Sequence, residues 1–429
     1  GQATETYRPE TSVAGFIQLP GSGRQVYNFN PGWRFFKGDI HGAESVDFDD
    51  RSWTIVSTPH TVELMPAEAS GCRNYQGPAW YRKHFVLPAE TKGKRVLIHF
   101  EAAMGKQVLY LNGKRIQEHV GGYLPFTLDL TTNGIQAGDS CLLAIFVDNS
   151  NDKSFPPGKP QYTLDFAYHG GIYRDVWMIA KSPVSITDPL DSQTVAGGGV
   201  FVHFDKISEK SAQVYVNTEL QNDNQHTETV TVETTLTDAD GKVIKRTSGK
   251  LSLKSGEKKI IRQQIEVKSP KLWSPDAPYL YKVQSRIKKG NQSIDGGITR
   301  IGIRLAEFRG KDGFWLNGKP FVQLVGANRH QDFAYVGNAL PNSQQWRDAK
   351  RLRDAGCTII RVAHYPQDPS FMDACDELGM FVIVATPGWQ YWNKDVKFGE
   401  LVHQNTREMI RRDRNHPSVL MWEPILNET

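Results

Sequence analysis

Cysteine is scarce in this chain, whose 429 residues include only Cys72, Cys141, Cys357 and Cys375, with no CxxC pair among them. Such wide spacing favours four reduced, buried thiols and supports neither a disulfide scaffold nor a zinc ribbon. Long apolar runs are also missing. The longest, such as residues 141–147, are as long as a strand and fall short of the ~18 residues of a membrane helix. We therefore expect no membrane-spanning segment.

The chain also lacks a strong excess of charge of either sign. Its 51 basic and 47 acidic residues leave a net charge of +4, spread along the chain without a block of like charge. This balance argues against nucleic acid or an anionic membrane surface as the main partner. A hydrophobic content of 39% and an aromatic content of 10% are typical of globular domains with real cores. At roughly 150 residues per domain, the length predicts about three domains.

The pattern of the chain changes twice, which predicts three domains behind an N-terminal extension of residues 1–23. Residues 24–183 hold short strand-like runs separated by turn signals such as Asn112-Gly113, and they predict a jelly-roll sandwich. Residues 184–305 alternate apolar and polar side chains, as in 228–234, which predicts an immunoglobulin-like β-sandwich.

Residues 306–429 alternate continuous apolar runs with helical segments. The runs are 321–327, 358–363, 381–385 and 418–422. Runs that are apolar on both faces predict buried parallel strands. Helices are expected between them: one capped by Ser343, one with Pro369 in its first turn, and one over 400–414. This order predicts the first half of a (β/α)8 TIM barrel, whose open sheet edges dimerisation or a second chain would cover.

Side chains that suit polyol binding follow the ends of these four strands, where a TIM barrel carries its active site. Binding pockets combine an apolar wall with a few placed polar groups, and indoles, imidazoles, amides and carboxylates supply both. The candidates are Arg329, His330, Asp332, His364, Tyr365, Trp389, Trp392, Glu423, Asn427 and Glu428. Each alone has an ordinary structural explanation, such as a loop cap or a core histidine. Their joint occurrence at strand ends favours a carbohydrate site.

Three of these segments resemble glycoside hydrolase family 2, the β-galactosidase and β-glucuronidase family. They are Gly326-Ala-Asn-Arg-His330, Ile360-Arg-Val-Ala-His-Tyr-Pro366, and Arg414 to Trp422 followed by Asn427-Glu428. Upstream, residues 170–176 and 272–281 resemble the ends of the family's sugar-binding and immunoglobulin-like domains. The resemblance therefore covers nearly the whole chain in the family's domain order.

The resemblance implies a retaining exo-β-glycosidase, with β-galactosidase as the leading activity and β-glucuronidase as the alternative. It makes Glu428 the general acid/base and Asn427 the residue that holds the sugar 2-hydroxyl, while His330 and His364 line the glycone subsite. Asp165 matches an aspartate that some galactosidases insert from the first domain. The remaining substrate-binding candidates are Arg329, Tyr365, Trp389 and Trp392.

The sequence departs from the family pattern at three places. The stretch 389–391 has neither the glutamate nor the histidine that hold magnesium in well-known galactosidases, so we expect no metal and no other cofactor. The interval from Trp422 to Glu428 is one residue longer than usual and contains Glu423, a rival carboxylate without a preceding asparagine. Gln331 stands where many members carry glutamate.

A retaining mechanism needs a second carboxylate, about 5–5.5 Å from the first, as nucleophile. The family places it on the seventh strand, and no residue of this sequence matches it, so we expect the N-terminal portion of a longer enzyme that is inactive alone. A non-catalytic carbohydrate-binding fragment and a scaffold without a sugar role are the alternatives. Residues 1–6 lack the basic and apolar parts of a signal peptide. We expect a mature periplasmic or secreted protein, with the cytoplasm as the alternative.

Overall fold

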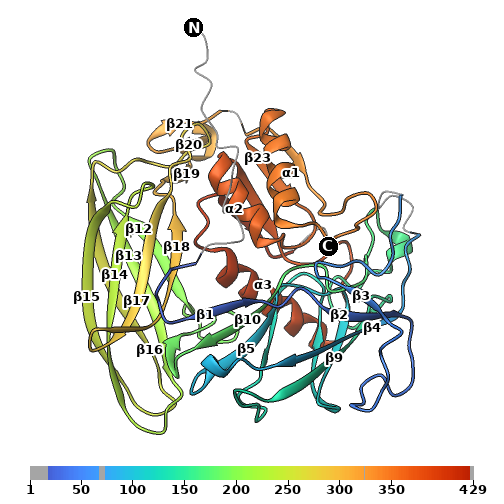
Figure 1. Cartoon of the computed structure of the whole chain (residues 1–429). Helices are drawn as coiled ribbons and strands as arrows, with labels where there is room; N and C mark the ends of the chain where they lie inside the picture. Colours follow the sequence, from blue (N-terminus) through green and yellow to red (C-terminus); the bar gives the residue numbers. More distant parts are fainter. Residues whose placement is uncertain (1–17, 67–72, 323, 426–429) are drawn as a thin grey trace.

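The computed structural model describes residues 18–66, 73–322 and 324–425, which form three domains (Figure 1). Strands dominate the first two domains, and all three α-helices of the described residues lie in the third. None of these helices is long and apolar enough to cross a membrane. Cys141 and Cys375 are buried and Cys357 is half-buried, all as free thiols, whereas Cys72 lies outside the described residues.

The first domain is a sandwich of two antiparallel sheets, as the jelly-roll prediction requires. The sheet orders are β3-β2-β4-β9-β6-β7 and β1-β10-β5-β8. The strands are β1 (Gln25–Asn28), β2 (Trp33–Lys37), β3 (Thr54–Val56), β4 (Pro78–Val86), β5 (Arg95–Phe100), β6 (Lys106–Leu111), β7 (Lys114–Val120), β8 (Phe126–Asp129), β9 (Ser140–Asp148) and β10 (Val176–Lys181). Trp33, Phe100 and Ile145 are among the side chains buried between the sheets. Asn112 and Gly113 both have positive φ, as the predicted β6–β7 hairpin turn requires.

The second domain is a sandwich of long antiparallel strands. One sheet is centred on β13 and the other has the order β15-β14-β17-β18. The strands are β11 (Val184–Ile186), β12 (Val200–Asp205), β13 (Ser211–Asn222), β14 (Glu228–Thr237), β15 (Val243–Leu253), β16 (Lys258–Lys268), β17 (Tyr281–Lys289) and β18 (Gln292–Ile301). Val214, Val216 and Val283 are fully buried and alternate with more exposed neighbours. The alternation of apolar and polar residues in the sequence therefore reflects sheets with one face in the core and the other toward solvent.

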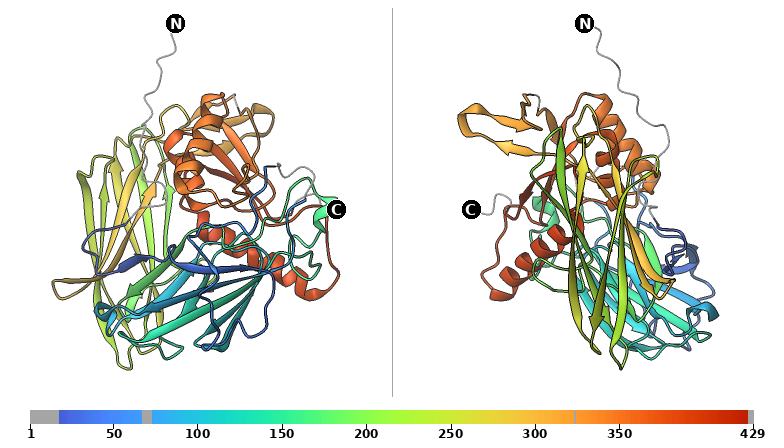
Figure 2. Two further views of the ribbon diagram at one scale, coloured as in Figure 1. Left: turned by 45° about the vertical axis from the view of Figure 1, so that its right-hand side comes forward. Right: turned by 90° about the vertical axis from the view of Figure 1, so that its left-hand side faces the viewer.

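The third domain contains a parallel sheet of order β22-β23-β24-β25, the first half of a TIM barrel. Its strands are β22 (Gly326–Asn328), β23 (Ile359–Val362), β24 (Phe381–Ala385) and β25 (Val419–Glu423), and its helices are α1 (Asn342–Asp354), α2 (Pro369–Leu378) and α3 (Val396–Asp413). A small antiparallel sheet of β19 (Ala306–Phe308), β20 (Phe314–Leu316) and β21 (Lys319–Pro320) precedes it. In both views of Figure 2, α3 (red) lies below the rest of the third domain, and Arg411 near its end donates to the Thr194 carbonyl of the second domain.

Three details of the barrel segment differ from the sequence-based expectation. Ser343 does not cap α1: the helix begins at Asn342 after Pro341, and no side chain caps it. Helix α3 begins four residues earlier than expected because the Asp395 side chain accepts a hydrogen bond from the Lys397 N–H. The first strand has only three residues, all exposed, because β22 is an edge strand that, within the described ranges, pairs with β23 alone. The cap on α2 follows the prediction, with Pro369 at its start and Gly379 in the left-handed region at its end.

The three domains are joined by polar contacts of buried and half-buried side chains. Arg174 of the first domain donates to the Gln331 side chain and to the Pro366 carbonyl of the barrel segment, both at 2.9 Å. The Asn415 side chain, just beyond α3, accepts a hydrogen bond from the Val202 N–H at 2.9 Å and donates one to the Val200 carbonyl at 2.7 Å, both on β12. The indole N–H of Trp273 in the second domain donates to the Asp376 carbonyl of α2 at 3.0 Å. The Arg174 contacts fix the ends of the barrel strands relative to the first domain, and the Asn415 and Trp273 contacts join the barrel segment to the second domain.

Candidate active site

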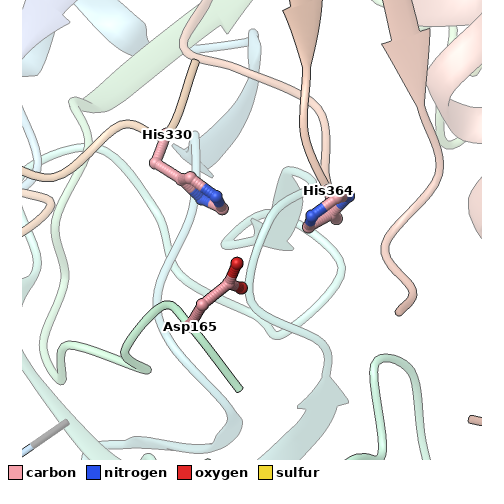
Figure 3. A group of neighbouring side chains, drawn as sticks. All are labelled: Asp165, His330 and His364. Atoms are coloured by element: carbon pink, nitrogen blue, oxygen red, sulfur yellow. The ribbon is translucent and has the colours of Figure 1, made fainter. Parts of the chain in front are cut away.

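Two histidines from the barrel and one aspartate from the first domain meet in front of the strand ends. His330 follows β22, His364 follows β23, and Asp165 lies in the segment of the first domain after residues 161–163. One ligand atom from each of the three side chains lies within 4.8 Å of the other two. Figure 3 shows the carboxylate and the two imidazoles pointing toward one another. We call these three residues the Asp165 cluster.

Aromatic side chains hold the two imidazoles in place. The Tyr365 hydroxyl lies 3.0 Å from His330 Nδ1, and the Phe166 ring stacks on the His330 ring at a centroid distance of 5.1 Å. The Trp389 indole stacks on His364 at 3.9 Å. Tyr365 itself is buried, so it positions His330, while Trp389 is half-buried and forms a wall beside His364.

The imidazoles of the cluster are neutral near pH 7. Burial lowers the pKa of His330, and burial together with the neighbouring His330 and Arg361 lowers the pKa of His364 to about 4. A neutral imidazole has one donor and one acceptor nitrogen, which suits a sugar hydroxyl. Nδ1 of His364 is buried and has no hydrogen-bond partner among the described residues. An unpaired buried nitrogen is unfavourable, so this site fits a ligand that supplies the missing hydrogen bond.

The rival carboxylate Glu423 is engaged elsewhere. Both of its carboxylate oxygens lie 3.0 Å from Nε of Arg361, which is on β23 of the same sheet. Both oxygens of this carboxylate are engaged by the Arg361 guanidinium, so the geometry directs Glu423 to the sheet and not to a substrate. The preferred candidates Asn427 and Glu428 lie outside the described residues.

Two strand-end residues turn away from the Asp165 cluster. Arg329 is buried against α1 and α2, where it pairs with Asp348 at 2.8 Å and bonds to Gln345 and Gln367. These partners supply hydrogen bonds and a counter-charge to the Arg329 guanidinium, which therefore needs no contact with a substrate. Gln331 is fully buried and accepts the hydrogen bond from Arg174, so it belongs to the domain interface.

Asp332, by contrast, faces the first domain at the rim of the site. Its carboxylate lies 3.9 Å from Nε2 of His169. Burial acts to raise its pKa, but the neighbouring His169 and His330 imidazoles outweigh burial and keep the pKa of Asp332 below its usual value. Asp332 is therefore ionised and forms part of the contact between the domains.

The segment that carries Asp165 is joined to the β24–α3 loop at three points. The Lys159 ammonium donates to Gln390 Oε1 at 3.0 Å, and the Asn393 amide donates to the Lys153 carbonyl at 2.8 Å. Between them, Gly158 lies against Tyr391 so closely that an added Cβ would come within 2.6 Å of the ring. We call residues 151–168 the docking segment.

Among the described residues, two groups of side chains have donor sets that could hold a metal ion. The Asp165 cluster offers two imidazoles and a carboxylate, a set that suits zinc and other divalent ions. The other group is Asp373, Asp376 and His416, where His416 Nδ1 already lies 2.6 Å from Asp376 and the Arg300 guanidinium 3.8 Å from Asp373. A guanidinium beside the carboxylate opposes a cation, so the second group is explained as an ion-pair network.

Sequence reasoning missed several residues of the site. Phe166 and Tyr123 pack the docking segment and the first domain against the cluster, and Tyr123 stacks on Tyr365 at 4.2 Å. Arg174 lies within residues 170–176, which resemble the end of a sugar-binding domain, but the sequence does not indicate a role for its side chain. A single sequence gives no signal that an isolated aromatic or arginine of a β-rich domain contacts another domain.

One large hollow lies away from the cluster. It has a volume of about 870 Å³ and separates the first domain, near Lys92, Arg95 and Ile135, from the second domain, near Gln221 and Asp223. Arg95 is paired there with both Asp129 and Asp223 at 2.9 Å. Volume alone therefore does not locate the chemistry in this molecule.

Comparison with family models assigns all three domains to one family. The model "Glycosyl hydrolases family 2, sugar binding domain" matches residues 43–183, "Glycosyl hydrolases family 2" matches 198–304, and "Glycosyl hydrolases family 2, TIM barrel domain" matches 308–429. Members named as β-galactosidases or β-glucuronidases are O-glycosyl hydrolases. The family resemblance and the fold class seen in the sequence are thus confirmed.

Some relatives are named β-galactosidases and others β-glucuronidases. A β-galactosidase of Thermoanaerobacter pseudethanolicus is 36% identical over 95% of this chain and 52% of the relative, and a β-glucuronidase of Formosa agariphila is 32% identical over 94% and 42%. Among solved structures, a Bacteroides uniformis β-glucuronidase superposes with a TM-score of 0.84 at 32% identity, over 93% of this chain and 46% of that one. The chain spans about half the length of the curated relatives it matches.

Proposed function

Because this chain belongs to glycosyl hydrolases family 2, we propose that it forms the glycone-binding part of a retaining exo-β-glycosidase that acts on terminal β-D-galactosides. The observation that carries this proposal is the Asp165 cluster at the strand ends. It offers one carboxylate acceptor and two neutral imidazoles, which match a ring of neutral hydroxyls. The stacked indole of Trp389 supplies the apolar wall.

A neutral sugar fits this cluster better than a uronic acid. The carboxylate of a glucuronide would enter a pocket that already holds the Asp165 carboxylate beside two neutral imidazoles. Two like charges about 5 Å apart repel by about 3 kcal/mol at an effective dielectric constant of 20. Arg361, a cation near the site, is already paired with Glu423. β-Glucuronidase remains the second candidate because several relatives and solved structures carry that name.

In the proposed reaction Glu428 is the general acid and base. It protonates the glycosidic oxygen as the bond to the leaving group breaks, and later removes a proton from the attacking water. The intermediate requires a second carboxylate that attacks the anomeric carbon, and no residue of this sequence is assigned to that role. Glu423 does not fit it, since its ion pair with Arg361 occupies both oxygens. Asn427 and the Asp165 cluster hold the glycone in place.

The test compares aryl β-D-galactosides with aryl β-D-glucuronides, using the protein that carries residues 1–429 and its Asp165→Asn variant. We expect the parent to prefer the galactoside, and the variant to lose kcat/KM on it by about 10- to 100-fold, as for the loss of a charge-assisted hydrogen bond. Asp152→Asn is the matched control, because Asp152 is an exposed aspartate of the docking segment that bonds to Ser154. It should leave kcat/KM unchanged.

A second variant tests the role of Glu428. Glu428→Gln should slow the hydrolysis of substrates with poor leaving groups by about 10²- to 10⁴-fold, and less for dinitrophenyl glycosides, whose leaving groups need no proton. Added azide should restore turnover and give a β-glycosyl azide. A preference for glucuronides that increases in Asp165→Asn would overturn the galactosidase assignment, and an unaffected Glu428→Gln variant would overturn the mechanism.

A further inference from the structure

We propose that the Asp165 cluster binds a zinc ion when no sugar is bound, and that zinc and the glycone compete for the same three side chains. Zinc is then a competitive inhibitor of the enzyme and not its cofactor. The metal site does not depend on any activity, whereas the inhibition rests on the proposed glycosidase function. The donor set, two imidazole nitrogens and one carboxylate oxygen, matches the ligands of zinc sites that keep one position open.

The distances within the cluster allow one ion to reach all three ligand atoms. Each of these atoms lies within 4.8 Å of the other two, and the three side chains point toward one another (Figure 3). Zinc bonds of about 2.0–2.2 Å in a tetrahedral site place neighbouring ligand atoms about 3.3 Å apart, so the cluster must close by at most about 1.5 Å. Asp165 is exposed and His330 is half-buried, so rotation of their side chains can supply this movement.

An outer contact already orients the His330 ring for a metal. The Tyr365 hydroxyl lies 3.0 Å from Nδ1 of His330, which leaves Nε2 as the nitrogen available to a ligand. Metal-bound imidazoles commonly donate their other N–H to such an oxygen, and this contact fixes both the tautomer and the ring orientation. Nδ1 of His364 is buried and has no hydrogen-bond partner among the described residues. No hydrogen bond at this nitrogen therefore selects the tautomer of His364, which can adjust to a metal.

The charges around the cluster favour a cation. The negative charges of Asp165 and Asp332 both act on His330 to stabilise a positive charge there. Two guanidiniums near the histidines, those of Arg329 and Arg361, act in the opposite direction, but each is paired with a carboxylate of its own. Because magnesium and calcium prefer oxygen ligands and zinc accepts imidazole nitrogen, the mixed donor set selects zinc over these two ions.

The cluster can be reached from solvent. Its carboxylate is exposed, as the position of Asp165 in the docking segment allows. Trp392, the second indole expected at the site, packs edge-on against Phe398 of α3 at a centroid distance of 5.6 Å, and within the described ranges no ring contact links it to either histidine. An ion can therefore enter the cluster, and a water molecule can fill the fourth position that three protein ligands leave open.

The same atoms serve the metal and the sugar, which makes the two ligands exclude each other. A ring nitrogen that gives its lone pair to zinc cannot accept a hydrogen bond from a sugar hydroxyl. The Asp165 oxygen that binds zinc is likewise lost as an acceptor. Zinc should therefore raise KM for galactosides without changing kcat.

The first experiment measures metal binding without any turnover. Co²⁺ is added to the EDTA-treated and buffer-exchanged protein that carries residues 1–429, its visible absorption is followed, and zinc should then displace it. Asp165→Asn and His330→Gln should each weaken binding by about 100-fold or more, because the loss of an outer contact alone costs about 10- to 100-fold. Tyr365→Phe, which removes such a contact, should weaken binding by about 10-fold. The matched controls Asp152→Asn and His41→Gln, at exposed residues outside the cluster, should bind as the parent does.

The second experiment measures the hydrolysis of an aryl β-D-galactoside in the presence of zinc. We expect a higher KM at unchanged kcat, and EDTA should restore the original KM. Magnesium and calcium at the same concentration should have no effect. Galactose should in turn weaken the binding of zinc, because the exclusion is reciprocal.

The absence of metal binding, or binding that survives in both Asp165→Asn and His330→Gln, would overturn the proposal. In a parent that hydrolyses galactosides, it is also overturned if zinc lowers kcat at unchanged KM, or if galactose leaves zinc binding unchanged. A parent that binds zinc through the cluster but hydrolyses no glycoside would contradict the proposed glycosidase function alone and would support the metal site.

Discussion

Replacing Phe166 by alanine should release Asp165 from the active site while leaving the barrel segment intact. Phe166 is 2% exposed and lies in the docking segment next to Asp165. Its ring contacts the rings of His330, His364 and Tyr365 at centroid distances of 5.1, 5.8 and 5.6 Å. These contacts cross from the first domain to the barrel, so they stabilise the docked position of the segment.

The size of the effect follows from this burial. Truncation of a buried phenylalanine to alanine costs about 3–5 kcal/mol. Taking about 3 kcal/mol, because the ring lies at a domain interface, the equilibrium between docked and undocked segment shifts by about 100-fold. Hydrogen exchange of residues 151–168 should become about 100-fold faster where it occurs from the undocked state. On galactosides kcat/KM should fall in proportion to the fraction of docked segment that is lost, up to the about 10- to 100-fold expected for complete loss of Asp165.

Hydrogen–deuterium exchange with mass spectrometry and steady-state kinetics on an aryl galactoside measure the two effects. Phe166→Leu should keep most of the docking, and Phe308→Ala, at an exposed phenylalanine, should change neither quantity. The reasoning is refuted if Phe166→Ala loses activity but the exchange of residues 151–168 stays as in the parent. It is equally refuted if the exchange of residues 151–168 shows a mostly undocked segment while kcat/KM is unaffected.

Three further perturbations follow from the structure. Gly158→Ala should raise KM for galactosides and lower the melting temperature, because the new Cβ would meet Tyr391 at 2.6 Å from a backbone with φ of +76°; Gly134→Ala, at an open turn with similarly positive φ, separates backbone strain from the clash. Burial raises the pKa of Glu408 to about 7 from 4.5, so the stability this group contributes is present below pH 4.5 and is lost as the pH rises through 7. The free energy of unfolding of Glu408→Gln should therefore exceed that of the parent at pH 8 by up to about 3 kcal/mol, with no such gain at pH 4.5. Thermal melts at both pH values measure this, with Glu400→Gln at an exposed glutamate as the control, and equal gains at both pH values would contradict it. Treatment with EDTA should leave kcat/KM unchanged, and restoration by added divalent cations would contradict the prediction of a metal-free site.

The architecture and the cluster of strand-end histidines could be predicted from local patterns. Continuous apolar runs identified β23 and β24 almost to the residue, since buried parallel strands need apolar side chains on both faces. Because parallel strands end at one edge of a sheet, His330 and His364 were expected to be neighbours, and the structure places their ring centroids 5.5 Å apart. The expected role of each in sugar binding stays a prediction.

The contacts between domains could not be predicted from the sequence. Arg329 shares the strand end with His330, but its guanidinium turns to Asp348 on α1, a choice decided by side-chain direction and helix packing. Arg174 and Phe166 join partners 157 and 164 positions away in the chain. Likewise the peptide bond between Ala363 and His364 is cis, which no local signal indicates for a residue other than proline.

The arginine that crosses from the jelly roll into the barrel segment limits how far these domains behave as exchangeable modules. Arg174 is 1% exposed and donates to Gln331 and Pro366 of the barrel segment and to Tyr123 of its own domain. A chimaera that grafts the jelly roll of another protein onto this barrel would bury an amide and a carbonyl without their donor. Recombination of such domains by gene fusion should therefore succeed only when the arginine and its two acceptors travel together.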